Sequence, residues 1–178
     1  MNDPFFIAAQ IANLLNIIVT IAAFQFKKLP HILLANVASN VLLALNYVFL
    51  GAFSGAWVGT LAAIQTIVIY FLDKKQTKKQ TRLYLLVFFG VMYIIGTAIV
   101  YKQWFDCISC VCALLYVASI LQTNPKSLRR FSFVNISLWI VYDICAMAYT
   151  TIITHVLVLS SIIIAMIRLD INKNKEKA

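Results

Sequence analysis

The sequence predicts an all-α integral membrane protein of seven transmembrane helices. Composition is the first reason: of the 178 residues, 62% are hydrophobic and 12% are charged. A soluble domain is roughly 45–50% apolar and about 25% charged. The second reason is that the apolar residues lie in seven runs, each near the length of about 20 residues that a helix needs to cross a bilayer.

The seven runs follow one another along the chain with short polar or basic segments between them. They are Phe5–Phe26, Ile32–Leu50, Ser54–Leu72, Leu83–Tyr101, Phe105–Leu121, Phe131–Tyr149 and Ile152–Leu169. A spanning segment must satisfy its own backbone hydrogen bonds, so each run is a helix or part of a closed barrel. The runs lack the period-two alternation of a barrel, and we therefore expect helices.

The connections divide the chain. Gly51–Phe53 and Thr150–Thr151 are very short, so the runs on either side of each are expected to form tight hairpins. Asp73–Arg82 is longer and basic, and the run after it, Leu83–Tyr101, has no hairpin partner. The expected organisation is a first three-helix bundle (1–72), a basic loop with a linking helix (73–103), a second three-helix bundle (104–171) and a polar cytoplasmic tail (172–178).

The basic residues predict the orientation. With the N-terminus outside, fourteen of the fifteen Lys and Arg residues fall on the inner side and only Lys102 falls outside. Short cytoplasmic segments are enriched in Lys and Arg, so the C-terminus is expected in the cytoplasm. The net charge of +9 is spread over these loops and forms no single basic face, which argues against nucleic-acid binding.

The two triplets resemble each other. One helix between them gives both the same orientation, so they are expected to be parallel repeats. A gapless offset of 99 pairs Lys27 with Lys126 and Asn36 with Asn135. The matching span lengths and charged loops carry this interpretation, and the few residue identities agree with it.

Polar side chains within the apolar runs are the candidates for a solute site. An ionisable side chain at the bilayer centre costs about 2.5–3.5 kcal/mol on the insertion scale and usually faces a cavity or a partner. At 100° per residue, polar and aromatic side chains gather on one face of each of two runs. They are Asn135, Trp139, Tyr142 and Asp143 in the sixth run, and Asn36, Asn40 and Tyr47 in the second.

We expect amides, a carboxylate and aromatic rings on these faces to bind a small polar solute. The alternative is hydrogen bonding between helices, worth about 0.6 kcal/mol on average. For Asn36 and Asn135 the sequence favours that alternative, and for Asp143 beside Trp139 it favours binding. Two further candidates are Asn13 in the first run and Gln65 in the third.

Several other features have plainer interpretations. His155 lies near the outer end of the last run, where an interfacial histidine is common, and a proton-relay role is the alternative. Gly51, Gly55 and Gly59 form overlapping G-x-x-x-G steps that allow close helix approach. This glycine face also offers a surface for a homodimer, and the sequence leaves that question open.

No enzyme, metal site or cofactor is predicted. The chain has no H-E-x-x-H, no Gly-rich phosphate loop and no Ser-His-Asp order. Cys107 and Cys110 form a C-x-x-C, but no histidine or second cysteine pair lies near them to complete a metal site. Free cysteine in an apolar run behaves as a small hydrophobe.

Several stretches carry a family resemblance. They are Phe26-Lys-Lys-Leu-Pro, Asn46-Tyr-Val-Phe-Leu-Gly-Ala-Phe-Ser-Gly-Ala-Trp, Lys126-Ser-Leu-Arg-Arg and Ser137-Leu-Trp-Ile-Val-Tyr-Asp. With these the chain resembles the YgjV family of bacterial inner-membrane proteins, which is similar to the wider SWEET, PQ-loop and PnuC-like group. The resemblance implies an inner-membrane location, two three-helix bundles joined by one helix, and alternating access.

The resemblance also implies how a substrate is held. In SWEET-like proteins Asn and Trp side chains near mid-membrane bind it, and Asn40, Trp139 and Asp143 are the nearest candidates by position. The sequence departs from that pattern because it has no Pro-Gln pair, and Pro4, Pro30 and Pro125 all lie outside the middle of the runs.

The function expected is a small-solute transporter, as a uniporter or a proton-coupled carrier. Two alternatives stay open. One is a vitamin or nucleoside carrier of the PnuC kind, in which aromatic rings stack on a heterocycle. The other is a receptor or assembly protein of the same fold that moves no solute and uses the basic loops for docking.

Overall fold

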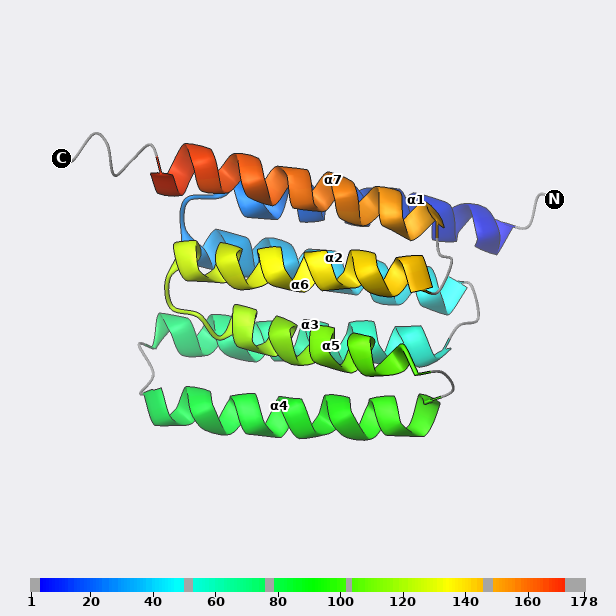
Figure 1. Cartoon of the computed structure of the whole chain (residues 1–178), viewed down its shortest axis with the longest axis horizontal. Helices are drawn as coiled ribbons and strands as arrows, with labels where there is room; N and C mark the ends of the chain where they lie inside the picture. The colour runs from blue at the N-terminus through cyan, green and yellow to red at the C-terminus, as the bar shows by residue number, and fades with distance from the viewer. Residues whose placement is uncertain (1–3, 50–52, 76–78, 102–103, 146–148, 172–178) are drawn as a thin grey trace. The chain divides into compact units, whose positions relative to one another are not determined.

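A computed structural model describes residues 4–49, 53–75, 79–101, 104–145 and 149–171. The described helices, in chain order, are α1 (Pro4–Gln25), α2 (Leu29–Phe49), α3 (Phe53–Lys74), α4 (Lys79–Val100), α5 (Asp106–Ile120), α6 (Pro125–Cys145) and α7 (Tyr149–Ala165), followed by the short π-helix η1 (Met166–Ile171) (Figure 1). Strands are absent from these ranges. The predicted all-α class and the seven helices are therefore confirmed.

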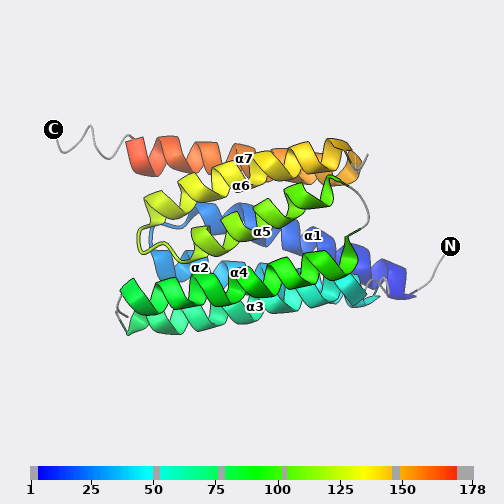
Figure 2. The same cartoon turned by 60° about the horizontal axis from the view of Figure 1, so that its bottom comes forward.

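The helices form two compact units, Met1–Lys75 and Gln76–Ala178. In unit 1, α1 and α3 both pack against α2. In unit 2, α5 and α7 both pack against α6, and α4 packs against α5; Figures 1 and 2 show these four helices side by side in chain order. Each unit thus has a central helix, α2 or α6. The helix expected as a link, α4, belongs to the second unit.

Local sequence explains why α6 begins earlier than the predicted apolar run. Asn124 caps the helix, since its Oδ1 accepts a hydrogen bond from the Lys126 N–H at 2.9 Å. Pro125 follows at the first helical position, where its missing N–H costs nothing. The basic segment that the sequence placed before Phe131 is therefore the first turn and a half of the helix.

The other end of α6 corrects a predicted boundary. The sequence placed the last hairpin connection at Thr150–Thr151, but α6 ends at Cys145 and α7 begins at Tyr149. Both threonines are therefore helical, and the connection falls before them. Threonine is only a weak helix breaker, so its position gave no reliable boundary. The predicted tail at 172–178 lies outside the described residues.

The outward-facing surface is apolar. On α1, for example, Ile11, Leu14 and Ile18 are each more than half exposed. Contiguous apolar patches of this kind are rare on soluble monomers and are typical of contact with lipid or another protein. Among the described residues, four segments are long and apolar enough to cross a membrane: Pro4–Gln25, Leu29–Asn46, Gln80–Ile99 and Thr151–Asp170.

The other three helices are not among these four segments, and each has an identifiable reason. α5 is apolar but has only 15 residues. α6 carries Lys126, Arg129, Arg130 and Asp143. Part of α3 lies outside the residues whose side chains the structure describes.

Helices α2 and α3 approach closely at a glycine. A Cβ on Gly59 would lie 3.1 Å from the backbone nitrogen of Ala44. This agrees with the interpretation of the glycine steps as packing positions. Gly51 and the surroundings of Gly55 lie outside the described part of the structure.

Candidate functional site

A carboxylate and an imidazole meet between α6 and α7. Asp143 Oδ2 lies 2.6 Å from His155 Nδ1, a distance at which the two groups share a hydrogen bond. The Asp143 side chain is 3% exposed and that of His155 is 18% exposed. Charge-assisted hydrogen bonds of this kind are shorter and stronger than neutral ones. The pair is a polar contact between two largely apolar helices.

Aromatic rings surround this pair. The Trp139 indole stacks on the His155 imidazole with 5.9 Å between ring centroids and 25° between planes. Trp139 also contacts Tyr142 edge to face at 5.4 Å, and Tyr142 contacts Phe105 at 5.7 Å. We call Trp139, Tyr142, Asp143 and His155 the acid–aromatic cluster.

The cluster lies at one end of unit 2. Asp143 is two residues before the end of α6, and His155 lies six residues into α7, about 9 Å from its start. The sequence placed Asp143 deeper inside its run, because that run was expected to continue to Tyr149. A carboxylate in the last helical turn is opposed by the negative end of the helix dipole, so a cationic partner there stabilises it.

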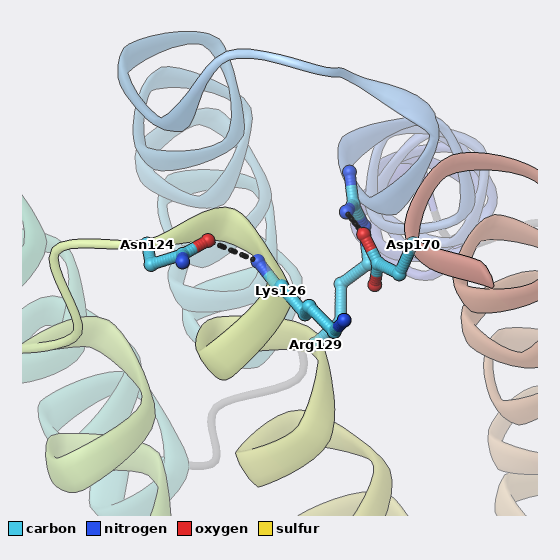
Figure 3. A network of polar contacts seen from close by, with 4 residues as sticks. All are labelled: Asn124, Lys126, Arg129 and Asp170. Carbon is cyan, nitrogen blue, oxygen red and sulfur yellow. Dashed lines mark hydrogen bonds and ion pairs between the residues drawn. The ribbon is translucent and has the colours of Figure 1, made fainter. Parts of the chain in front are cut away.

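The opposite end of α6 carries a second ion pair. Arg129 Nη1 lies 2.7 Å from Asp170 Oδ1 in η1, and both side chains are buried (Figure 3). Arg129 and Asp143 are fourteen residues apart, about 21 Å along the helix. α6 is therefore joined to α7 by an acid–imidazole contact at one end and to η1 by an ion pair at the other.

Between the two ion pairs, α6 is held to α5 by neutral groups. The Asn135 side-chain amide donates to the backbone oxygen of Cys112. The hydroxyls of Ser119 and Ser132 lie 2.7 Å apart. Asn135 thus makes the interhelical bond that the sequence favoured for it, and it lies about one helical turn from Trp139 and two turns from Asp143.

In unit 1, Ser39 and Asn40 of α2 contact the neighbouring helices through neutral groups. Ser39 donates to Asn16 Oδ1 at 2.6 Å, and its hydroxyl lies 2.6 Å from that of Thr20. On the other side of α2, the Asn40 amide lies 3.5 Å from the Thr66 hydroxyl. These groups lie near the middle of α1, α2 and α3.

The other predicted residues of unit 1 are placed as follows. The Asn36 amide donates to Ile32 O of its own helix at 2.8 Å, whereas the sequence favoured a bond between helices for it. Gln65 is fully buried, and neither of its side-chain polar atoms has a hydrogen-bond partner among the described residues. Asn13 is half-buried on α1. The side chain of Tyr47 lies outside the described residues.

Two residues with close polar contacts were missed or underestimated from the sequence. His155 was interpreted mainly as an interfacial residue, and Ser39 was not singled out. The hairpin between the last two runs gave a usable signal for His155, because residues on either side of a short connection face each other. Because the connection was predicted at Thr150–Thr151 and α7 in fact begins at Tyr149, the residues expected to face each other across the hairpin were the wrong ones. For Ser39, the neighbouring Asn40 drew attention to the adjacent face of the helix, and serine alone in an apolar run has no distinctive pattern.

Comparison with known proteins gives one match. A family model described as Imp-YgjV, bacterial inner membrane protein, matches residues 7–173. No curated protein and no solved structure matches the chain.

Proposed function

The chain belongs to the Imp-YgjV family of bacterial inner membrane proteins, and from this premise we propose that it is a carrier that moves a small polar solute across that membrane. The observation that carries the proposal is the acid–aromatic cluster. An ionisable side chain buried in a membrane protein is costly and commonly marks the path of a substrate or an ion. Here the carboxylate, an imidazole and two aromatic rings come together within unit 2.

The chemistry of the cluster suggests the kind of solute. The Asp143 carboxylate accepts hydrogen bonds from hydroxyl, amide or amine groups, and the Trp139 and Tyr142 rings offer apolar faces for stacking. Such a site binds a small molecule that has donors on one side and a flat or apolar part on the other. No catalytic role is assigned to these residues in this proposal.

The proposal includes the full membrane topology. All seven helices cross the membrane, with the N-terminus outside and the C-terminus in the cytoplasm. The four apolar helices of spanning length and the one-sided distribution of Lys and Arg support it. In this topology the acid–aromatic cluster lies at the outer end of unit 2, and alternating access exposes it first to one side of the membrane and then to the other.

A carrier accounts for the buried pair better than a docking protein does. A receptor that docks through its basic loops does not require a carboxylate–imidazole contact between two helices, and the Asp143 carboxylate is almost fully buried. The likeness to SWEET and PnuC carriers stays a prediction that agrees with this choice.

Thermal stability with added ligands tests the proposal. The purified protein is heated with sugars, amino acids, vitamins and nucleosides, since a ligand at a hundred times its dissociation constant stabilises by about 2.7 kcal/mol. We expect one class to raise the melting temperature of the native chain and of Asp73→Asn, and to leave Asp143→Asn unchanged. Asp73 lies at the end of α3 outside the cluster, so it controls for loss of one negative charge.

Uptake into proteoliposomes completes the test. Accumulation of the stabilising solute that is lost in Asp143→Asn and Trp139→Ala supports the carrier and its site. Unchanged uptake in both variants contradicts the site. A stoichiometric partner protein that co-purifies, with no ligand effect and no uptake, contradicts the carrier.

A further inference from the structure

We propose that Asp143 and His155 form a proton-binding site, and that the solute moves together with the proton this site carries. The coupling rests on the proposed carrier function, whereas the proton site itself does not. Three observations support it: the 2.6 Å contact between the two groups, their burial, and the stacking of Trp139 on the imidazole.

Proton counting explains why this pair holds one proton. With one proton, the pair is neutral overall, either as carboxylate and imidazolium or as carboxylic acid and imidazole. Removing that proton leaves a buried negative charge, and adding a second leaves a buried positive charge. A net charge in apolar surroundings is costly. The one-proton state is therefore the stable one while the site is closed to water.

Proton exchange then requires access to water. Histidine is the side chain whose ordinary titration lies between pH 5 and 8, so the free imidazole exchanges a proton under physiological conditions. His155 is partly exposed, whereas Asp143 is almost fully buried. The imidazole therefore takes the proton from water and shares it with the carboxylate behind it.

The neighbouring groups leave this assignment intact. α5 and α7 are the helices packed most closely on α6 near the pair. α5 contributes the Cys112 thiol, which interacts electrostatically with Asp143. The Asp106 carboxylate, at the start of α5 and next to the Phe105 that contacts Tyr142, adds no positive charge. The two neutral neighbours are the Cys112 thiol and the Tyr142 phenol of α6 itself. Both are neutral in the ordinary range of the pair. Arg129 is about 21 Å away along α6, so among the described groups His155 is the one that balances the carboxylate.

The two ends of the α6–α7 contact then respond differently to pH. The Arg129–Asp170 pair stays charged because arginine does not lose its proton in this range. The Asp143–His155 contact weakens when its proton leaves, because the bare carboxylate no longer faces an imidazolium. Proton release therefore loosens the helices at the cluster end and leaves the other end joined.

Trp139 serves as a built-in reporter for the test. The chain has three tryptophans, Trp57, Trp104 and Trp139. The variant W57F/W104F keeps only Trp139, whose fluorescence is quenched when the stacked imidazole becomes cationic. We expect its emission to decrease on acidification between pH 9 and 5 along a one-proton curve, in detergent and without any solute.

Matched variants decide the source of the change. In the W57F/W104F background, His155→Gln keeps a hydrogen-bond donor for Asp143 but cannot titrate, so its emission should be flat. Asp143→Asn should also lose the step from this range, because an unpaired imidazolium in apolar surroundings is disfavoured. The control W57F/W139F keeps Trp104, which is 66% exposed and contacts Phe105, and it should show no one-proton step.

Each outcome bears on one proposal. A flat titration of Trp139 in the otherwise native chain overturns the proton site, even if a solute still binds and is carried. A step that persists in Asp143→Asn overturns the shared site. A step lost in both variants supports it; if no solute then accumulates in proteoliposomes with or without a pH gradient, the carrier function fails and the proton site remains.

Discussion

The central helices of the two units, α2 and α6, contact their neighbours through different chemistry. α2 uses Ser39 and Asn40, whose partners are hydroxyls and amides. α6 has neutral contacts to α5 but joins α7 and η1 through Asp143 and Arg129. Hydroxyls and amides do not titrate, whereas a carboxylate–imidazole pair does. The proposed proton site therefore predicts that the α6–α7 contact depends on pH, whereas the contacts of Ser39 and Asn40 do not.

The comparison also shows how far the predicted repeat extends. Asn36 and Asn135 correspond at an offset of 99, and both are buried on central helices. Asn135 bonds the backbone of the neighbouring helix α5, whereas Asn36 bonds its own helix. α2 and α6, which have 21 residues each, thus carry different side-chain contacts.

The largest effect is expected at the buried ion pair of unit 2. Arg129→Ala leaves Asp170 buried without its cation, which should lower the free energy of unfolding by about 3–5 kcal/mol. Thermal or denaturant unfolding in detergent measures it. Arg130→Ala is the matched control, because Arg130 is exposed on the next position of the same helix, and it should change stability by less than about 0.5 kcal/mol.

A double variant sharpens that prediction. Replacing both partners, as R129M/D170L, removes the unpaired charge and should recover most of the lost stability. Equal losses in the Arg129 and Arg130 variants would contradict the ion pair as the main contact at this end.

The next effect separates the two corresponding asparagines. Asn135→Ala removes the hydrogen bond that joins α6 to α5, which should cost about 1.5 kcal/mol, the upper end for a buried neutral hydrogen bond. Asn36→Ala removes a bond within its own helix that joins no second helix, so its cost should be smaller. Unfolding of the two variants under identical conditions gives the difference, and equal values would restore side-chain equivalence between the units.

A smaller effect is expected where α2 and α3 approach. Gly59→Ala puts a Cβ 3.1 Å from the Ala44 backbone, so the helices must separate slightly, at a cost of about 1 kcal/mol or more. Gly96→Ala on α4 is the control, because its Cβ meets nothing within 4 Å. There the better helix propensity of alanine should leave the melting temperature unchanged or raise it. The same change in both variants would rule out close approach as the cause.

The smallest effect is expected in the hydroxyl contacts of unit 1. Ser39→Ala removes the bonds to Asn16 and Thr20, and interhelical bonds of this kind average about 0.6 kcal/mol. The loss should be the same at pH 5 and pH 8, since no titrating group takes part. A pH-dependent loss would contradict the contrast between the units.

Much of the fold could be predicted from the sequence. Helix number and order follow from runs near bilayer length, which leave few other structures for the backbone. The start of α6 could also be read from Asn124 and Pro125, a capping residue followed by proline. Its end could not, because Thr150 and Thr151 favour neither a helix nor a turn strongly enough to fix a boundary.

The candidate site was predicted in part. Helical periodicity places Trp139, Tyr142 and Asp143 on one face of α6, because side chains three and four residues apart are neighbours on a helix. It gives no information on which residue of another helix meets that face. The partner of Asp143 depends on the register between α6 and α7, and a shift of one helical turn would bring a different residue to it.

The sequence by itself determined the helical class, the apolar exterior and the faces that hold polar residues, because these follow from composition and from a period of 3.6 residues. The tertiary structure decided which polar groups meet: Asp143 with His155, Arg129 with Asp170, and Ser39 with Asn16 and Thr20. These contacts depend on the axial position of one helix against the next. That position is set by the packing of many side chains together, such as Gly59 on Ala44, and no local pattern of the chain specifies it.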